Sequence, residues 1–309
     1  MNDKGHALQN RFPSMRLLSD PLRIPVEQIV SEYRGREWKV SDVKDMQDFA
    51  CHQAAILSDG SYSVFVKLSE AANGVEQFEI ELAGLRLLTQ RSGVLTPISI
   101  GNILVEGGTL MVLEAVHAVD RGPYQWRQIG QTLARIHKVK GDKCGLETQG
   151  YFGPLYQDNR PTSNWSVFYA ERRLRPRLMG AVDSGNLPSD VIRKIEKLIS
   201  RLPDLCGPET TPSLLHGDAS QNNFISTEMG AMVIDPAVHY GNPEFDLAYI
   251  DYFQPVPEDV FRGYQEIMPI DAGFRERRDL WRVYGYLAAV TVEGPVHLSK
   301  LTAAVQKYV

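Results

Sequence analysis

The chain has 309 residues, of which 43% are hydrophobic, and its formal net charge is −5. This composition is ordinary for a globular protein that can bury a substantial core. The negative charge and the lack of a run of Lys and Arg exclude a general attraction to nucleic acid or to an anionic membrane. No stretch reaches the roughly 18 apolar residues that a membrane-spanning helix needs.

The cysteines and the start of the chain predict where the protein works. Cys51, Cys144 and Cys206 are odd in number and widely spaced, which supports neither a disulfide framework nor a zinc site. Residues 1–14 are polar and lack the apolar segment of a secretory signal peptide. We therefore expect a cytoplasmic protein in a reducing compartment.

The first elements in chain order are an extension, a helix and a hairpin. Residues 1–23 lack clear periodicity and are expected to form an N-terminal extension. Pro25 is predicted to open a short helix, because proline is favoured at a first helical position. Two strand-like runs, 54–58 and 61–68, are joined by Asp59-Gly60, which is typical of a two-residue hairpin turn.

The second of these strands carries a candidate phosphate-binding lysine. Tyr62, Val64, Val66 and Leu68 alternate along it, so Lys67 is expected on the opposite face of the sheet. The following segment, 77–89, has the apolar spacing of an amphipathic helix and contains Glu81. The apolar run 109–115 is predicted to be a further strand. Residues 24–114 would then form a β-rich N-lobe that binds nucleotide.

The rest of the chain, 115–309, is predicted to form a mainly α-helical C-lobe. Apolar spacing predicts helices near 126–136, 163–174 and 189–202. Within 214–237, two short apolar runs flank a polar loop, which is a common place for catalytic residues. The overall expectation is an α+β fold with two lobes.

The segment 214–237 also carries the strongest chemical signal. Asp218 follows His216-Gly217, Asn223 comes five residues later, and Asp235 comes twelve residues after that. Phosphoryl transfer needs a group that orients or deprotonates the attacking hydroxyl, and it needs oxygen ligands for Mg²⁺. Asp218 suits the first task, and Asn223 with Asp235 suits the second. This segment alone leaves open that Asp218 and Asn223 only cap a loop.

The lysine and glutamate upstream favour the catalytic interpretation. A strand lysine paired with a helix glutamate is the arrangement that grips nucleotide phosphates in kinases. Taken singly, Lys67 and Glu81 could each be an exposed surface charge. Because both precede the Asp218, Asn223 and Asp235 set in the order that kinases use, the sequence predicts a protein-kinase-like fold that binds ATP and Mg²⁺.

With these residues in place, the chain resembles the fructosamine/ketosamine kinase family, within the aminoglycoside and choline phosphotransferase group. The resemblance extends from about Val40 to the end of the chain. It rests on stretches that are more specific than kinase motifs in general: Tyr151-Phe152-Gly153, Gln157-Asp158-Asn159, Trp165, Phe168 to Leu174 (FYAERRL), Asp235 to Val238, and Asp246-Leu247-Ala248.

The resemblance implies a reaction and a set of roles. The γ-phosphate of ATP would pass to the 3-hydroxyl of a ketosamine, either a small molecule or a protein-linked adduct, and the product would break down in a repair process. Asp218 would accept or orient the hydroxyl proton, and Asn223 and Asp235 would bind Mg²⁺. Lys67 and Glu81 would hold the ATP phosphates. The backbone from Glu114 to Val116 would be the hinge that meets adenine.

Some positions depart from the family pattern. Ser220 stands where the family usually has tryptophan, and Asn222 where it has glycine, so an aromatic platform for the sugar is absent there. His239 and Asn242 stand where tyrosine and histidine are usual. The phosphate-covering loop, expected within 45–54, contains no glycine.

These departures keep two alternatives open. One is a kinase for another hydroxyl acceptor, such as an aminoglycoside or choline. The other is a non-catalytic nucleotide-binding pseudokinase. The oligomeric state is not predicted.

Four further residues each have a structural and a functional interpretation. His216 is expected to hold the catalytic segment through backbone bonds rather than to act as a base. Cys51 is expected to be an inert small residue. Trp165 either lies in the core or lines the substrate site, and Asp246 either supports the catalytic loop or caps a helix.

Overall fold

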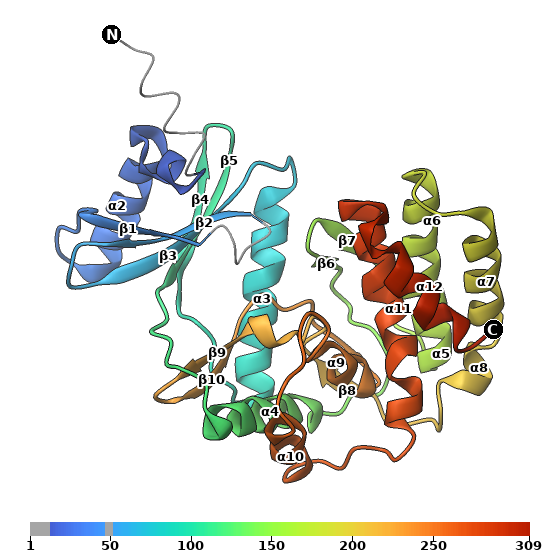
Figure 1. Cartoon of the computed structure of the whole chain (residues 1–309). Coiled ribbons are helices and arrows are strands. Elements are labelled where there is room, and N and C mark those ends of the chain that lie inside the picture. Colours follow the sequence, from blue (N-terminus) through green and yellow to red (C-terminus); the bar gives the residue numbers. More distant parts are fainter. Residues whose placement is uncertain (1–12, 47–51) are drawn as a thin grey trace. The chain divides into compact units, whose positions relative to one another are not determined.

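The computed structural model describes residues 13–46 and 52–309. The chain forms two compact units (Figure 1). The first consists of the residues up to Leu85 together with Thr96–Val119, and the second of Arg86–Leu95 together with Asp120–Val309. Helix α3 (Gly74–Ser92) belongs to the first unit up to Leu85 and to the second from Arg86.

The first unit is built on one antiparallel sheet with strand order β1-β2-β3-β5-β4. Its strands are β1 (Asp42–Asp45), β2 (Gln53–Ser58), β3 (Ser63–Ser69), β4 (Ser99–Val105) and β5 (Gly108–Glu114). Besides α3 it has two helices, the 3₁₀ helix η1 (Pro13–Leu18) and α2 (Asp20–Arg34). Strands β1 and β4 were not foreseen from the sequence.

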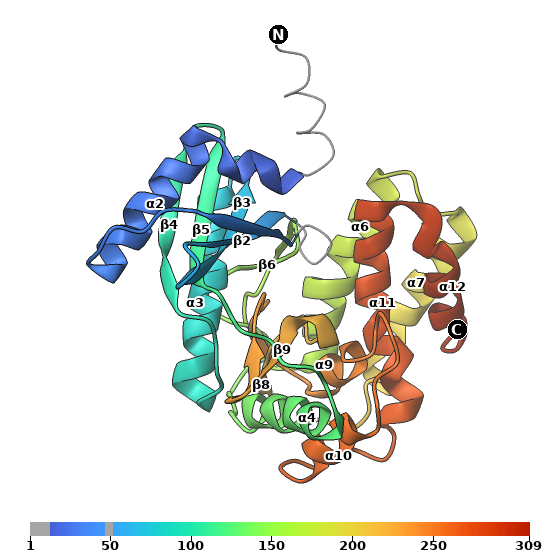
Figure 2. The same cartoon turned by 60° about the vertical axis from the view of Figure 1, so that its left-hand side comes forward.

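The sheet is covered on both faces, and α2 and α3 lie on opposite sides of it (Figures 1 and 2). Val64, Val66 and Leu68 of β3 pack in one apolar cluster with residues of η1 and α2. Phe65 packs in a second cluster with residues of α3. The predicted alternation along this strand is confirmed, and it places Lys67 on the α3 side.

Two local predictions for this unit are wrong. The helix begins at Asp20 instead of Pro25, because Pro21 takes the first-turn position and Pro25 lies inside the helix. Leu22 is buried in the core of the unit. The loop joining β2 to β3 has four residues, since the Asp59 carboxylate accepts hydrogen bonds from the N–H groups of Ser61 and Tyr62, both at 2.7 Å, and so closes a wider turn.

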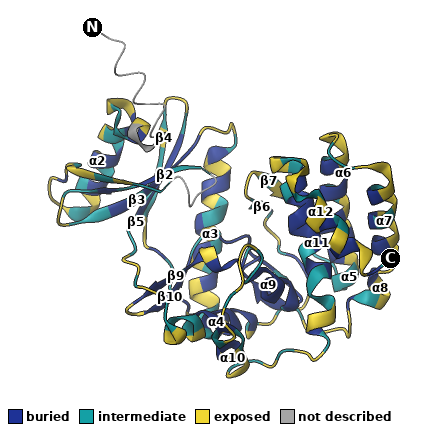
Figure 3. Cartoon of the chain, in the orientation of Figure 1, coloured by how far each residue is buried: buried dark blue, intermediate teal, exposed yellow. Residues whose placement is uncertain are grey.

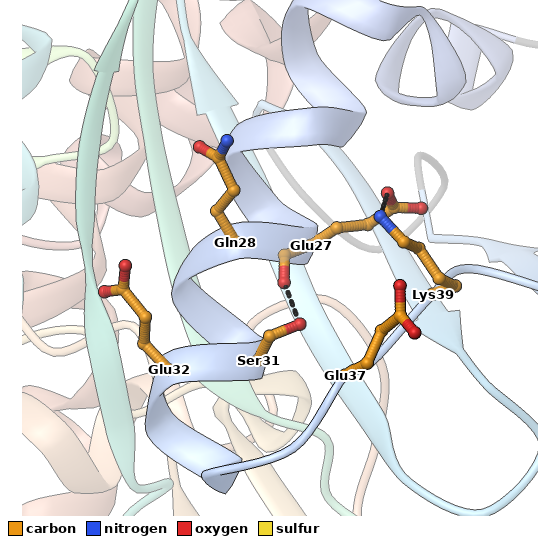
Figure 4. A pocket seen from close by; sticks show the side chains of 6 residues that line it. All are labelled: Glu27, Gln28, Ser31, Glu32, Glu37 and Lys39. Atoms are coloured by element: carbon orange, nitrogen blue, oxygen red, sulfur yellow. Dashed lines mark hydrogen bonds and ion pairs between the residues drawn. The ribbon is translucent and has the colours of Figure 1, made fainter.

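A buried glutamate ties α2 to the segment that follows it (Figure 4). Glu27 is 2% exposed, and its carboxylate accepts from Arg23 at 2.7 Å and from Lys39 at 3.1 Å. The Val40 N–H donates to the same carboxylate at 3.2 Å. These bonds hold the pKa of Glu27 below its usual value although burial alone would raise it. The shallow pocket drawn in Figure 4 therefore contains a fully satisfied carboxylate.

The second unit is mainly helical. Its longer helices are α4 (Pro123–His137), α6 (Arg175–Asp183), α7 (Ser189–Ser200), α11 (Phe274–Glu293) and α12 (Leu298–Gln306). Its shorter helical segments are α5 (Trp165–Phe168), η3 (Tyr169–Leu174), α8 (Leu202–Leu205), η4 (Gln221–Asn223), α9 (Glu244–Tyr249), α10 (Asp259–Gln265) and η5 (Pro295–His297). Helix α9 is buried at every residue (Figure 3).

Three antiparallel strand pairs complete this unit. They are β6 (Gly150–Phe152) with β7 (Leu155–Gln157), β8 (Ser213–Leu215) with β11 (His239–Gly241), and β9 (Phe224–Thr227) with β10 (Gly230–Val233). The two apolar runs predicted within 214–237 contain β8 and β10. The segment between them was predicted to be a polar loop, but it also contains η4 and the strand β9, which pairs with β10.

One predicted helix contains an unforeseen widening. The segment predicted over 163–174 begins as α5 and continues as the π-helix η3. The Tyr169 hydroxyl donates to the Leu280 carbonyl at 2.7 Å, and the Arg173 guanidinium donates to Asn159 Oδ1 at 2.6 Å. Both buried side chains thereby have polar partners outside the helix, while Arg173 Nε has none among the described residues.

Within the described ranges, the structure has no helix that is long and apolar enough to cross a lipid bilayer. Cys144 and Cys206 are free and buried. Cys51 lies outside the described residues, as does most of the expected phosphate-covering loop at 45–54.

Candidate active site

The first unit brings the predicted lysine and glutamate together. Lys67 projects from β3 toward α3, and its Nζ lies 2.9 Å from Glu81 Oε2 and 3.2 Å from Oε1. Lys67 is only 6% exposed. The glutamate therefore fixes the position of an ammonium group that would otherwise be a flexible point charge.

The predicted hinge follows β5 in the same unit. The Glu114 side chain accepts hydrogen bonds from the Tyr62 hydroxyl at 2.8 Å and the Tyr33 hydroxyl at 3.1 Å, so the side chain is tied to the unit itself. The Ala115 N–H donates to Ser63. Among the described residues, the Val116 N–H has no hydrogen-bond acceptor. A backbone donor without a partner is what a ring nitrogen of adenine can use.

In the second unit, a buried aspartate anchors the loop that carries Asp218. Asp246 on α9 is fully buried, and its carboxylate accepts from the N–H of His216 at 2.7 Å and from the N–H of Gly217 at 3.0 Å. His137 Nε2 lies 3.1 Å from the same carboxylate. Of the two interpretations left open for Asp246, the structure therefore supports the loop-anchoring one.

The His216 ring also stabilises this loop through hydrogen bonds. Its Nε2 lies 2.9 Å from the Ile234 carbonyl, and its Nδ1 accepts from the Asp218 N–H at 3.2 Å. Burial lowers the pKa of the His216 ring, so the ring is neutral with its proton on Nε2. It links Asp218 to the residue just before Asp235, which agrees with the structural role expected from the sequence.

Gly217 allows the Asp218 loop and the segment after Asp235 to pack closely. Its φ is +82°, and a Cβ at this position would lie 2.0 Å from the Ala237 carbonyl oxygen. The Ala237 N–H in turn donates to the His216 carbonyl at 2.8 Å. Any side chain at Gly217 would push the Asp218 loop away from the segment that follows Asp235.

Both predicted metal ligands interact with Asp218. Asn223 Nδ2 donates to the Asp218 carbonyl at 2.7 Å, which leaves its Oδ1 as an available oxygen ligand. Asp235 has a φ of +50°, and it is the sole non-glycine residue with positive φ in the described ranges. Strained backbone of this kind is concentrated at functional sites.

The electrostatic setting of Asp218 differs from that of an ordinary aspartate. Burial, together with the nearby charge of Asp235, raises the pKa of the Asp218 carboxyl to about 7, although a hydrogen bond with Asn223 acts in the opposite direction. Such a carboxyl can exchange a proton near neutral pH.

The donor set suits Mg²⁺ better than a transition metal. No cluster of three or more His, Cys, Asp or Glu side chains that could hold a metal occurs in the part of the chain that the structure describes. One amide oxygen and one carboxylate fit Mg²⁺, which is usually held by one or two protein oxygens and completed by water and substrate phosphates.

Two residues near the anchor were missed from the sequence. His137 lies at the end of α4, and its Nδ1 is 2.8 Å from the hydroxyl of Tyr264 on α10. Figures 1 and 2 show these two helices side by side. The only available sequence signal was a histidine ending an amphipathic helix, which is more often a satisfied core residue.

Two of the departing positions lie away from the surface. His239 is fully buried and stacks against Trp165 and Phe168, and burial lowers the pKa of its ring to about 3. Trp165 belongs to this aromatic cluster, which favours its core interpretation. Ser220 is 1% exposed. Neither His239 nor Ser220 therefore presents a surface to a substrate.

An aromatic segment after α9 is hydrogen-bonded to the loop that carries Asp218. The Gln221 N–H donates to the Ile250 carbonyl at 3.1 Å, and its side chain donates to the Gln254 carbonyl at 3.3 Å. Between these carbonyls, Tyr252 is partly exposed and Phe253 is 59% exposed. The segment thus brings aromatic surface close to the Asp218 loop.

Comparison with known proteins agrees with this arrangement. The sequence model of the fructosamine kinase family matches residues 24–309. A probable ketoamine kinase of Synechocystis is 29% identical over 266 residues, covering 85% of this chain and 88% of that protein. The chloroplastic protein-ribulosamine 3-kinase of Oryza sativa subsp. japonica is 29% identical over 296 residues, covering 94% and 83%.

The fold matches as well. A solved structure described as a "putative fructosamine-3-kinase" of Thermobifida fusca superposes with a TM-score of 0.80 at 31% identity, covering 92% of this chain and 98% of that one. This likeness confirms the predicted α+β, protein-kinase-like fold. Together with the family match over most of the chain, it shows that the protein belongs to the fructosamine kinase family.

Proposed function

We propose that the protein transfers the γ-phosphate of ATP to a sugar hydroxyl of a ketosamine. The acceptor oxygen forms a bond to the γ-phosphorus while the bond from that phosphorus to the bridging oxygen breaks. ADP leaves with the electron pair, and the hydroxyl proton passes to Asp218. The names of the ketoamine and ribulosamine kinases among its relatives support this acceptor class.

The observation that carries the proposal is the environment of Asp218. Its loop is held by Asp246 through two backbone N–H groups, so the carboxylate has a fixed position. Its pKa is raised to about 7, which matches a group that takes up a proton during turnover at neutral pH. Positioning and electrostatics contribute most of the catalysis in phosphoryl transfer.

The remaining residues are assigned to the nucleotide. Lys67, held by Glu81, would bind ATP phosphates, and the backbone from Glu114 to Val116 would meet adenine. Asn223 Oδ1 and Asp235 would hold Mg²⁺, which neutralises phosphate charge when bound. The available Oδ1 of Asn223 and the unpartnered N–H of Val116 support these assignments.

A different hydroxyl acceptor is the second candidate. It is favoured by Ser220, which supplies no aromatic platform, and by the exposed Phe253, which offers one from another segment. An aromatic face stacks with a sugar ring or with an apolar amine substituent. The acceptor of this protein can therefore differ from that of relatives with tryptophan at the Ser220 position.

The test measures Mg²⁺-dependent ADP formation by the purified protein, with ribulose-lysine, fructose-lysine, an aminoglycoside or choline as acceptor. We expect turnover with at least one of the two ketosamines. Asp218→Asn should lower turnover by about 10³-fold or more, as for other essential catalytic groups. Asp190→Asn is the matched control, because Asp190 is an exposed aspartate on α7.

The outcomes separate the candidates. Turnover with the aminoglycoside or choline and with neither ketosamine would replace the first proposal by the second. Nucleotide binding with no acceptor-stimulated turnover would contradict both and indicate a pseudokinase. Equal activity of Asp218→Asn and the unmodified protein would exclude Asp218 as the proton acceptor.

A further inference from the structure

An arginine without a role in the proposed reaction is bonded to the segment that carries Asn223. Arg121 lies just before α4, and its Nη2 donates to the Gln221 carbonyl at 3.1 Å and also to the Phe224 carbonyl. Gln221 and Phe224 lie on either side of Asn223 in the chain, and all four residues belong to the second unit. One nitrogen of Arg121 therefore holds the backbone on both sides of a predicted metal ligand.

The position of Arg121 is itself fixed by α4. Its guanidinium carbon lies 4.8 Å from the ring centroid of Trp126, in the first turn of that helix. The Gly122 N–H donates to the side chain of Gln125 at 3.0 Å, which fixes where the helix begins. Helix α4 packs against β9 and β10 (Figure 1). Arg121 is therefore held next to the strand that follows Asn223.

The charge of Arg121 is not used in an ion pair. Among the described residues no carboxylate pairs with it, and burial lowers the pKa of its guanidinium. Burying a charge without an opposite charge costs free energy. The two carbonyls and the ring of Trp126 offset this cost. The contacts of Arg121 are thus directed to the backbone beside Asn223.

The short helical turn η4 depends on such bonds from outside. It has only three residues, and the hydrogen bonds of a single 3₁₀ turn have poor geometry. The Asn223 N–H donates to the Ser220 carbonyl at 3.0 Å, and the Ile234 N–H donates to the Asn223 carbonyl at 3.0 Å. These bonds connect Asn223 to the residue before Asp235, and Arg121 adds bonds to the residues on both sides of it.

We propose that Arg121 is a positioning residue for the Mg²⁺ site. By holding the carbonyls of Gln221 and Phe224, it keeps Asn223 Oδ1 where it can serve as an oxygen ligand. Residues that orient metal ligands without touching the metal typically contribute about 10- to 100-fold to metal affinity. The inference rests on the proposed function, because Asn223 is a metal ligand only if the protein uses Mg·ATP.

The first test measures binding of Mn²⁺ to the full chain in the presence of ADP, from the paramagnetic resonance signal of free Mn²⁺. Mn²⁺ is a suitable probe because it takes the same oxygen ligands as Mg²⁺. Arg121→Met should weaken Mn²⁺ binding about tenfold. Loss of a positive charge near a cation site would by itself strengthen binding, so weaker binding reports a displaced Asn223.

Arg135→Met is the matched control. Arg135 is an exposed arginine of the same helix, so its replacement removes the same charge and should leave Mn²⁺ binding unchanged. Urea unfolding shows whether each variant is folded. If Arg121→Met is not, Arg121→Lys decides. Lysine keeps the charge but lacks the planar group that stacks on Trp126 while it bonds both carbonyls, so Arg121→Lys should also weaken Mn²⁺ binding.

A Mg²⁺ titration of turnover separates positioning from a general structural role. Arg121→Met should need about tenfold more Mg²⁺ for half-maximal turnover and should regain most of its turnover at saturating Mg²⁺. A loss of turnover that Mg²⁺ does not restore would indicate a structural role and overturn the inference. Mn²⁺ binding by Arg121→Met that equals or exceeds that of the unmodified protein would also overturn it, while the proposed function would stand. An unmodified protein that binds no Mn²⁺ with ADP would contradict the proposed function and the inference with it.

Discussion

Asp246 and Asp218 are two aspartates of the same unit with opposite electrostatic settings. Asp246 is fully buried, and hydrogen bonds from His137 and from the His216 backbone hold its pKa below the usual value although burial alone would raise it. Asp218 is partly exposed, but its carboxylate has lost much of its hydration. This loss and the charge of Asp235 raise the pKa of Asp218 to about 7.

The opposite pKa shifts of the two aspartates follow from the hydrogen-bond donors and charges that surround each carboxylate. Asp246 faces two backbone N–H groups and a histidine, so its charge is stabilised and it can serve as a permanent anchor. Asp218 faces another carboxylate, so its charge is destabilised and it can accept a proton. Pairs of titratable groups whose pKa values are pushed apart commonly divide structural and catalytic work.

The largest expected effect comes from breaking the anchor. Asp246→Asn removes the charge that His137 and two N–H groups stabilise, and it should lower the free energy of unfolding by about 3–5 kcal/mol, as for other broken buried pairs. Urea unfolding monitored by circular dichroism measures this change. Asp190→Asn, at an exposed position of α7, should change it by less than about 0.5 kcal/mol. Equal stability of the two variants would show that Asp246 is not an anchor.

The sequence predicts the elements that carry strong periodicity. Alternation along β3 and the apolar spacing of α3 determine on which side Lys67 and Glu81 lie, because one face of each element must be buried. Strand β4 is partly exposed along most of its length, so it lacks that signal. The π turn of η3 gives no periodic signal, and the hydrogen-bond partners of Tyr169 and Arg173 lie on other segments of the chain.

The candidate site likewise has one part that the sequence predicts and one part that it does not. Asp218, Asn223 and Asp235 are close in sequence, so their spacing alone suggests that they act together. The anchor joins α4, α9 and the loop that carries Asp218, and nothing in the local sequence around His137 indicates its contact with Asp246. A buried polar network of this kind is defined by tertiary packing, which single-sequence patterns do not report.

The second prediction extends the comparison to the charge pair of the first unit. Lys67→Met removes the ammonium that Glu81 positions, and it should lower kcat/KM for ATP by about 100-fold, the usual cost of removing one donor to a charged transition state. That loss corresponds to about 2.7 kcal/mol. Steady-state kinetics with varied ATP measures it. Lys143→Met should leave kcat/KM for ATP unchanged, and an equal loss in both variants would contradict a specific role for Lys67.

The third prediction uses the raised pKa of Asp218 directly. A proton acceptor works only when deprotonated. Because kcat/KM for Mg·ATP reports ionisation in the enzyme before Mg·ATP binds, it should rise with pH and level off above about 7. At pH 6 it should be about tenfold below the plateau. A pH profile from 5.5 to 8.5 with nucleotide binding measured in parallel tests this. A flat profile over that range would mean that Asp218 is ionised throughout.

The smallest expected effect is on stability. A carboxyl whose pKa is higher in the folded than in the unfolded protein destabilises the folded state at pH values where it is ionised in the unfolded chain. The destabilisation by Asp218 is therefore small near pH 4 and grows as the pH rises to about 7. Asp218→Asn cannot ionise and avoids the cost. At pH 8 without Mg²⁺ it should be more stable than the unmodified protein by about 1 kcal/mol, which allows for the partial exposure of Asp218. The difference should shrink toward zero near pH 4, because both side chains are then neutral. Urea unfolding at the two pH values measures it, and a variant that is less stable at pH 8 would show that the Asp218 charge is stabilised by its surroundings, as that of Asp246 is.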